Sequence, residues 1–477
     1  MTITRVLYKV WRVLRWLLLA VILLVLGFIA LVWWENRHDE PLLPEVAEAI
    51  RFEPPTPEQM RDNGYFTMLG LRAPPDEDAA EAGQRFFAAQ MKNYARYLDT
   101  GETIFSVEAY SHQRIDWESM RCEAEVADCY AYYLEHAQKI KSKLSDPMVL
   151  TERYLSLLGK PTYEEIVPPY IAGIPLGYAD VAAASILLDI QAALLLNENR
   201  TDEALTLLET NAKIHRRMMQ GSRTLMGALV ALAMDMRQQR LISSALRHIP
   251  ALSSEQAQRL DALVESSMPV PLTHALEGER QMILNGILET TRHRPSYPDS
   301  PKEYQEPHQI NWLTELALAL AYLPNATAND EYSRWKEIVR LSLVPADQLE
   351  MEVDAIKQKS TDAFNDSGLL PFPLRNFVGS AMIEVSSLAW VEYVERAHDV
   401  EAYHRLIRLQ IAALRERVPF EKMPTWLADQ PPELRNPYTL QPMDWDAATQ
   451  SLVFTGAQRN TQNPAPGNVF RVYLGKP

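Results

Sequence analysis

The longest apolar stretch of the chain runs from Trp16 to Trp34 and contains no charged side chain. A helix rises about 1.5 Å per residue, so this stretch would span roughly 28 Å, close to the hydrocarbon thickness of a bilayer. Tryptophan favours membrane interfaces, and it stands at both ends of the stretch, at Trp16, Trp33 and Trp34. Residues 16–34 are therefore predicted to be a transmembrane anchor with the lipid bilayer as its partner.

Charged residues flank this stretch unevenly, because mainly acidic residues follow it and basic residues precede it. The basic residues are Arg5, Lys9, Arg12 and Arg15. Basic flanks stay on the cytoplasmic side of a membrane. Residues 1–15 are thus predicted to be cytoplasmic, and the chain beyond about residue 35 to lie outside, which in a bacterium is the periplasm. The location expected is the bacterial inner membrane, crossed once.

A cleaved signal peptide is the alternative to an anchor. Its apolar core is usually about 7–15 residues long and ends in a small-residue cleavage site. Here the stretch ends in Val32-Trp33-Trp34-Glu35, which offers no such site. The pattern therefore favours an anchor that is retained.

Beyond the anchor, residues 35–57 combine five prolines with acidic side chains, which is typical of a semi-stiff spacer. From residue 58 to residue 429 the apolar positions follow the helical period, so this range is predicted to be a helical domain. Outside the block described next, helices are expected at 78–98, 127–142, 147–158, 254–266, 270–291, 310–322, 330–343, 345–358, 380–397 and 399–416. Three helix starts are predicted from local residues: capping boxes from Thr56 to Gln59 and from Ser253 to Gln256, and Ser145-Asp146-Pro147 before the helix at 147–158.

The clearest helical block covers residues 179–247. Short turns separate three amphipathic segments, the first at 179–197, the second from Thr201 and the third after Gly221-Ser222. Such a pattern predicts an array of helical hairpins, and its first two segments look like one tetratricopeptide-type unit. No 34-residue period repeats, so a regular solenoid is not predicted. A Pro-, Tyr- and His-rich stretch at 293–309 is expected to be a loop between two helical lobes.

The tail, residues 430–477, is rich in proline and holds two β-type runs, Leu452-Val453-Phe454 and residues 469–474. These runs predict a small hairpin packed on the helical body. The fold class expected is therefore all-α, a helical hairpin array that is partly tetratricopeptide-like. One N-terminal transmembrane helix and a small C-terminal β-hairpin complete it.

Cys122 and Cys129 are the only cysteines. On the outer side of the membrane thiols are oxidised, so a disulfide is predicted. Seven residues apart in a straight helix, their Cα atoms would be about 10 Å apart, beyond the roughly 7 Å that a disulfide tolerates. A bridge thus predicts a short cross-linked loop that leads into a helix at 128–142. Two free thiols are the alternative, and a zinc site would need more ligands than His112 and His136.

Composition argues against two classes of partner, nucleic acids and nucleotides. The net charge of −15 argues against a nucleic-acid partner, because phosphate binding needs clustered lysine and arginine. The chain has only 17 glycines and contains neither of the two glycine-rich phosphate-binding motifs, so no nucleotide partner or cofactor is expected. A globular chain of this size and composition is expected to be folded throughout most of its length.

Two residue pairs were considered as sites and neither is assigned. His274 and Glu277 share a helix face and could bind a metal with two further ligands, although such pairs are more often an exposed helix face. Glu265-Ser266 is similar to the Glu-Ser pair of lytic transglycosylases, whose Glu is a general acid. The Gly-Leu-Met-Gln-type element of that family is absent here. No HExxH or G-x-S-x-G motif occurs, and no catalytic, cofactor-binding or metal-ligating residue is predicted.

His398 beside Asp399 stands at an apparent boundary between two helices. In that place His398 could cap the carbonyl groups of the preceding helix and interact favourably with its dipole.

Three segments together carry a resemblance: the Cys122/Cys129 pair followed by LTERYLSLL, the segment RTLMGALVALA at 223–233, and the tail LRNPYTLQPMDWDAATQSLVF. The combination resembles a group of bacterial membrane-anchored, mostly helical envelope proteins to which no function is assigned. In that group the tail has the form Asp-Pro-Phe/Tyr-Thr-Gly-x-Pro-x-x-Trp/Tyr. This chain has Asn436 for the Asp and Leu440 for the Gly, and glycine is the residue that readily supplies a positive φ. The resemblance implies a fold type and placement, and no activity or site.

The leading hypothesis is a membrane-tethered periplasmic helical domain that binds an envelope protein or another ligand in a groove between helix pairs. A cell-envelope hydrolase that uses acidic residues is one alternative, and a lipid-handling module is another. A pocket with convergent carboxylates or histidines would favour the hydrolase. An apolar tunnel would favour lipid handling.

Overall fold

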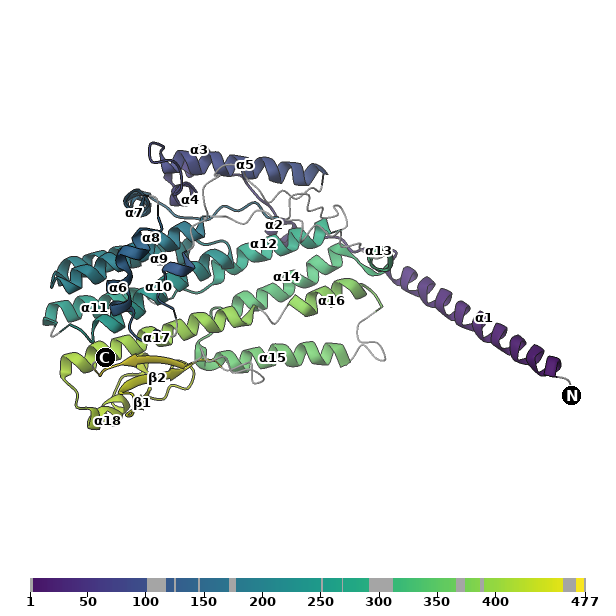
Figure 1. Ribbon diagram of the computed structural model, residues 1–477. Helices are drawn as coiled ribbons and strands as arrows, with labels where there is room; N and C mark the ends of the chain where they lie inside the picture. The colour runs from purple at the N-terminus through teal and green to yellow at the C-terminus, as the bar shows by residue number, and fades with distance from the viewer. Residues whose placement is uncertain are drawn as a thin grey trace.

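The computed structural model describes residues 3–100, 117–123, 126–144, 146–170, 177–249, 252–267, 269–290, 312–365, 374–386, 390–457 and 469–475. The loop predicted at 293–309 and His112 lie outside these residues, as do the side chains of Arg5 and Lys9. The protein is mostly helical, with one small antiparallel sheet near its C-terminus. Helix α1 projects from one end of an elongated helical body, and the C-terminus lies towards the other end (Figure 1).

Helix α1 covers Ile3–Asn36 and is long and apolar enough to cross a membrane. None of its most apolar part is buried in the body, and Trp16, Trp33 and Trp34 are all more than half exposed. A second helix, α8 (Tyr178–Asn197), passes the same test of length and composition, but 83% of its apolar window is buried. It is therefore explained as a core helix, whereas α1 has no partner inside the body for most of its length.

Most of the remaining helices overlap the ranges that were predicted. Their bounds are α2 Pro44–Ala49, α3 Pro57–Asp62, α4 Gly64–Leu69, α5 Ala79–Thr100, α6 Cys129–Lys141, α7 Pro147–Ser156, α9 Thr201–Gly221, α10 Leu225–Ala245, α11 Ser254–Ser266, α12 Thr273–Glu289, α13 Trp312–Ala321, α14 Pro324–Leu341, α15 Ala346–Asn365, α16 Phe377–Ser386, α17 Val391–Glu416 and α18 Met423–Ala428. In the described part of the chain, single 3₁₀ turns add to these at Glu118–Met120, Leu157–Gly159, Phe420–Lys422 and Pro432–Leu434.

The predicted boundary at residue 398 is wrong. Helix α17 is continuous from Val391 to Glu416, so 380–397 and 399–416 are not two adjoining helices. No glycine or proline interrupts this stretch. Both polar residues at the predicted boundary lie inside the helix and have partners there or in the tail. His398 lies 3.5 Å from Glu401 one turn later, and Asp399 accepts a hydrogen bond from Tyr438 of the tail.

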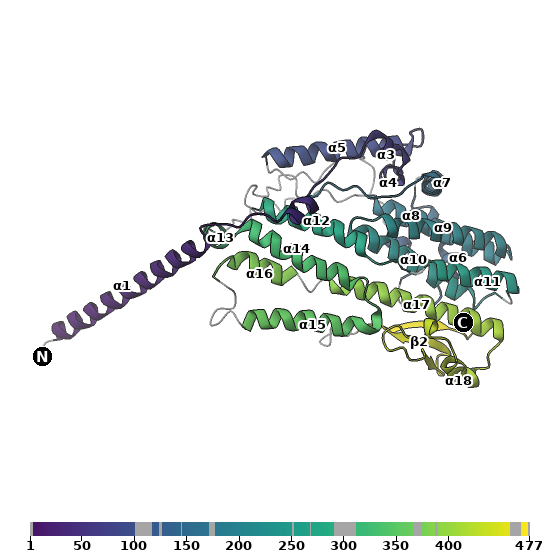
Figure 2. The ribbon, with the colours of Figure 1, turned by 180° about the vertical axis from the view of Figure 1, so that it is seen from behind.

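The hairpin block predicted at 179–247 forms the centre of the body. Helix α8 packs against α7, α9 and α10, and its residues are buried on almost every side. The turn from α8 to α9 passes through Asn199 with φ of 60°, a left-handed conformation that asparagine tolerates well. A second core gathers around the fully buried Trp335, between α12, α14, α15 and α17. Figure 2 shows α12, α14 and α17 running along the body between its two ends.

The cysteine pair has the geometry that was predicted. The Cys122 and Cys129 Cα atoms are 5.6 Å apart and their sulfur atoms are at disulfide distance, 2.13 Å. Cys129 begins α6, whereas Cys122 precedes it in non-helical chain, as the spacing argument required. The Arg240 guanidinium donates hydrogen bonds to the carbonyl groups of Cys122, at 3.2 Å, and of Val126, at 2.9 Å. The cross-linked loop is thereby attached to α10.

The tail forms a three-stranded antiparallel sheet rather than a hairpin alone. Strands β2 (Ser451–Thr455) and β3 (Val469–Tyr473) pair as predicted, with Leu452 opposite Val472. Sequence analysis missed β1 (Asp444–Asp446), which pairs with β2. This strand has only three residues, two of them acidic, so it lacks the apolar run by which a strand is recognised.

Part of the expected spacer at 35–57 is folded against the body. Helix α2 lies within it, and Val46 is fully buried between α12 and α14 among Leu284, Ile287 and Ala328. Asp39 accepts hydrogen bonds from the backbone N–H groups of Asn325 and Ala326 at the start of α14. A proline of this stretch is thus the first residue of α2, and the acidic residue Asp39 caps the start of α14.

We expect Leu440→Gly to raise the free energy of unfolding by up to about 1 kcal/mol. Leu440 has φ of 58° and an exposed side chain. Removing its Cβ relieves a left-handed strain of about 1–2 kcal/mol, and the greater freedom of glycine in the unfolded chain offsets roughly 0.5–1 kcal/mol of this gain. Thermal and denaturant unfolding should place Leu440→Gly above both wild type and Leu440→Ala. Equal stability of the glycine and alanine variants would contradict the expectation.

Candidate functional site

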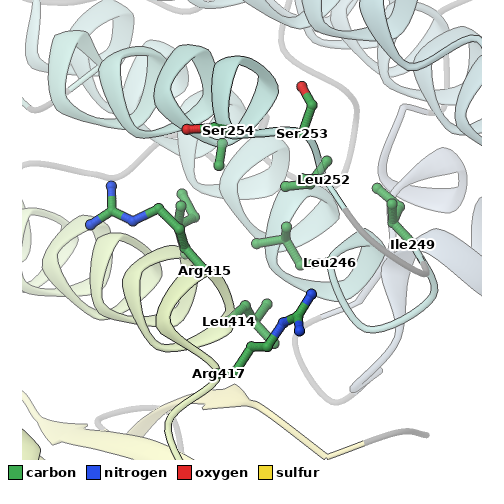
Figure 3. A pocket seen from close by; sticks show the side chains of 10 residues that line it. Leu246, Ile249, Leu252, Ser253, Ser254, Leu414, Arg415 and Arg417 are labelled. Carbon is green, nitrogen blue, oxygen red and sulfur yellow. The ribbon is translucent and has the colours of Figure 1, made fainter.

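A pocket of 510 Å³ opens at the end of the body opposite α1, between the C-terminal ends of α10 and α17 and the start of α11. Its apolar lining consists of Leu246, Ile249, Leu252, Ala257, Ile411 and Leu414. Its polar lining consists of Ser253, Ser254, Arg415 and Arg417. Figure 3 shows both arginines extending from the end of α17, with Leu414 and Leu246 beside them and the two serines across from them. We call this the distal pocket.

The local sequence explains both walls of the distal pocket. Helix α11 begins with the predicted capping box, in which the Ser253 hydroxyl accepts from the Gln256 N–H and the Gln256 side chain accepts from the Ser253 N–H. The start of a helix carries partial positive charge because its first N–H groups point outward. Helix α17 ends opposite it, where the Val418 N–H returns to the Ala413 carbonyl at 3.0 Å.

Arg417 adopts an unusual backbone conformation at this helix end, with φ of 53° and ψ of 46°. Glycine is the usual residue at such a position, since any Cβ costs about 1–2 kcal/mol there. Strain of this kind is concentrated at binding and catalytic sites in proteins. A charged side chain that is held in a strained position on a pocket therefore marks Arg417 as the first candidate for a functional residue.

The distal pocket is positively charged although the protein carries a net charge of −15. None of its lining residues is acidic. Arg415 lies 3.5 Å from Glu416, but both side chains are about half exposed, and such surface pairs contribute little. Among the described residues Arg417 makes no ion pair. The pocket therefore combines apolar surface with two guanidinium groups that can receive an anion.

A second group of polar side chains is buried inside the hairpin block. The Arg237 Nε donates to Asp189 Oδ2 at 3.1 Å, and its Nη2 donates to the Ser185 hydroxyl at 2.9 Å. Asn211 donates to Asp189 Oδ1 at 3.0 Å and accepts from the Tyr154 hydroxyl at 2.8 Å. These contacts connect α7, α8, α9 and α10. We call this set the buried network.

The buried network also contains a serine–histidine pair, which raises the question of nucleophilic catalysis. Ser185 Oγ lies 2.8 Å from His215 Nε2, but both side chains are fully buried and Asp189 contacts the arginine rather than the histidine. Burial, followed by the charge of Arg237, holds the pKa of His215 well below its usual range. A nucleophile needs access to substrate and a base oriented by a third group. The arrangement is therefore structural.

Helices α10 and α17 share another buried contact, between Asp235 and His404. Their side chains are fully buried with Oδ2 and Nε2 2.8 Å apart, and His404 Nδ1 lies 2.7 Å from the Val400 carbonyl. Burial alone would lower the pKa of His404, but the Asp235 carboxylate, the Val400 carbonyl and the charge of Glu401 together outweigh burial, so the net shift is upwards. This pair joins the hairpin block to the helix that carries Arg417.

The residue pairs considered from the sequence are not brought together into a centre. No group of three or more His, Cys, Asp or Glu side chains that could hold a metal occurs in the part of the chain that the structure describes, His274 and Glu277 included. Glu265 is near the end of α11 and forms an ion pair with Arg408 at 2.9 Å. His398 lies inside α17, so it does not cap a preceding helix, and that expectation is corrected.

The distal pocket was not predicted from the sequence. The capping box at Ser253 was visible in the sequence, but the strain at Arg417 was not, because nothing in Arg-Glu-Arg-Val predicts a left-handed residue. Comparisons with protein-family models, with curated proteins and with solved structures gave no match to this chain. The resemblance to bacterial membrane-anchored envelope proteins therefore stays a prediction.

Proposed function

We propose that the protein is a membrane-tethered binding protein of a bacterial envelope, held by α1 and displayed in the periplasm. Its distal pocket binds a ligand that has an apolar body and an anionic group. The observation that carries the proposal is the juxtaposition of Arg415 and Arg417 with an apolar cup in a strongly acidic protein. The basic residues in the first part of α1, before its apolar stretch, and the cysteine pair at disulfide distance support the orientation.

The chemistry of the distal pocket favours binding over hydrolysis. Its hydroxyl groups belong to Ser253 and Ser254, and no histidine or carboxylate stands among its lining residues to activate them. A ligand would place its apolar part against Leu246 and Leu414, while its anionic group approaches the arginines. The binding partner expected is thus an acidic amphiphile or an apolar peptide segment with a carboxylate, and both share this chemistry.

The test uses a matched pair of probes, 8-anilinonaphthalene-1-sulfonate and the uncharged N-phenyl-1-naphthylamine, on the full chain in nanodiscs, with empty nanodiscs subtracted. We expect Arg417→Gly to weaken sulfonate binding about tenfold, equivalent to about 1.4 kcal/mol, because a charge-assisted contact is lost. Binding of the uncharged probe should not change. Arg396→Ala removes another exposed arginine of α17 and serves as the control.

Arg417→Gly should at the same time raise the free energy of unfolding by up to about 1 kcal/mol, since glycine relieves the left-handed strain. If the variant binds the sulfonate more weakly but is more stable, the weaker binding is due to loss of the arginine and not to unfolding. Unchanged sulfonate affinity in this variant would overturn the proposed site.

A further inference from the structure

We infer that α13 and α16 form a second membrane contact, which seats the near end of the body on the bilayer surface beside α1. The inference rests on the proposed role of α1 as a membrane anchor. It adds that the body is held against the membrane at a fixed place instead of hanging from a flexible tether.

The first observation is that the end of α1 is fixed to the body by hydrogen bonds. The Asn36 side chain donates to the Leu374 carbonyl at 2.8 Å and accepts from the Asn376 N–H at 2.6 Å. The Arg375 guanidinium donates to the backbone carbonyl groups of Glu35 and His38. Helix α13 also contacts α1. The body therefore cannot swing freely about the point where α1 ends.

The residues after α1 extend this attachment. Asn329 of α14 accepts from the Leu43 N–H at 2.9 Å and donates to the Pro41 carbonyl at 3.1 Å. With the cap that Asp39 provides for α14, residues 36–43 act as a clamp, and no free spacer remains between the membrane and the body. The place where α1 leaves the bilayer thus decides which part of the body meets the lipid headgroups.

That place is marked by Trp33 and Trp34. Both indole rings are exposed, which is the arrangement expected at a membrane interface. Asn36, two residues later, lies within hydrogen-bonding distance of the chain at 374–376, and α16 begins at the next residue, Phe377. A helical turn is about 5 Å long, so the start of α16 lies within the headgroup region if α1 spans the bilayer.

The composition of α13 and α16 suits that environment. Their sequences, WLTELALALA and FVGSAMIEVS, contain one acidic residue each and no basic one. Leu316 of α13 and Phe377 and Met382 of α16 are each 40% exposed. The two helices contact each other, and Figure 2 shows them at the end of the body from which α1 projects. Ten residues are too few to cross a bilayer but suffice to lie in its interface.

Exposed apolar side chains also occur elsewhere, for example Met148 and Met226. Isolated residues of this kind are normal on protein surfaces and need no partner. The position of α13 and α16 beside the anchor distinguishes them, because α13 contacts α1 and α16 contacts α13. Arg375 lies between α1 and α16, is 43% exposed and is 4.0 Å from Glu40. Basic side chains near a membrane surface interact favourably with anionic lipids.

The chain's two cysteines are paired, so a single introduced cysteine gives one label site. We would attach an environment-sensitive nitrobenzoxadiazole group to Leu316→Cys and Met382→Cys in the full chain, reconstituted in nanodiscs with or without lipids that carry a nitroxide near the headgroup. Met148→Cys and Met226→Cys are the controls, since these side chains are at least as exposed. Leu24→Cys, in the middle of α1, reports on the anchor itself.

We expect the nitroxide lipids to quench the labels at 316 and 382 at least twofold and to leave those at 148 and 226 unchanged. Equal, weak quenching at all four positions, with strong quenching of the Leu24 label by a nitroxide deep in the acyl chains, would overturn the second membrane contact. A Leu24 label that no lipid quenches would instead show that the anchor proposal fails. A further variant, Phe377→Asp, should reduce the quenching at 382 by half or more.

Discussion

Replacing Arg237 by leucine is expected to lower the free energy of unfolding by about 3–5 kcal/mol, which is what the loss of one partner from a buried ion pair costs. Arg237 is 6% exposed and its partner Asp189 is fully buried. The variant would leave the Asp189 carboxylate in the core of the hairpin block with only the Asn211 amide as a donor. A loss of this size is a large fraction of the stability of an ordinary domain.

The pH dependence identifies the cause of that loss. Burial raises the pKa of Asp189 to about 6 even with Arg237 beside it. This value is already above that of the unfolded chain, and without the arginine the pKa of Asp189 rises further. A carboxyl group whose pKa is raised on folding contributes stability at low pH and loses that contribution as the pH rises. The deficit of Arg237→Leu should therefore be greater at pH 8 than at pH 5.

Two further variants distinguish the effect of losing the ion pair from the effect of changed packing on stability. The double variant Arg237→Leu with Asp189→Leu removes both charges and should recover most of the lost stability, as replacement of a buried pair by apolar residues often does. Arg200→Leu removes an exposed arginine and should leave the free energy of unfolding almost unchanged. Denaturant unfolding of the four proteins measures the differences. A double variant as unstable as the single one would show that shape, not charge, determines the loss.

Local sequence features predicted most of the helices of this fold. The capping boxes at Thr56 and Ser253, and the Asp146-Pro147 start of α7, lie at the helix starts that were expected. The spacing of Cys122 and Cys129 excluded a continuous helix between them, and this was confirmed. In each case the decisive interaction joins residues fewer than ten positions apart, so the sequence displays both partners together.

The features that sequence analysis missed depend on partners far apart in the chain. Asp189 and Arg237 are 48 residues apart, and neither has an oppositely charged residue three or four positions away in its own helix. The stretch predicted as a spacer is folded because Val46 and Asp39 meet helices that lie more than 200 residues further on. The distal pocket is likewise formed by residues far apart in the chain, since its two walls belong to α11 and α17.

The segment RTLMGALVALA shows how a local motif can owe its character to a distant residue. Its Thr224 caps α10 by accepting from the Gly227 N–H at 3.0 Å, which the sequence alone suggests. The glycine of the segment, Gly227, is explained by a residue outside it. A Cβ at Gly227 would overlap the carboxylate of Glu165, which lies buried against the start of the helix. The small residue in the motif thus leaves room for an anion from another part of the chain.

Glu165→Ala is accordingly expected to destabilise the protein by about 4 kcal/mol. The carboxylate accepts hydrogen bonds from the Arg223 N–H at 2.8 Å, from the Thr224 N–H and hydroxyl at 2.9 and 3.0 Å, and from the Tyr178 hydroxyl. Each buried donor left without a partner costs about 1–3 kcal/mol, and the helix start loses a favourable negative charge. Water that enters the space left by the Glu165 side chain would bind some of these donors and would reduce the loss of stability.

The neighbouring residue supplies the control for this variant. Glu164 also pairs with Arg223, at 2.8 Å, but its side chain is 49% exposed. Glu164→Ala should therefore cost less than about 1 kcal/mol. Chemical unfolding of both variants, with hydrogen exchange of the amides at 223–227, would show whether the start of α10 opens first when Glu165 is lost. Equal, small losses for the two variants would mean that Thr224 and Glu279, which accepts from the Leu225 N–H at 2.8 Å, cap the helix without Glu165.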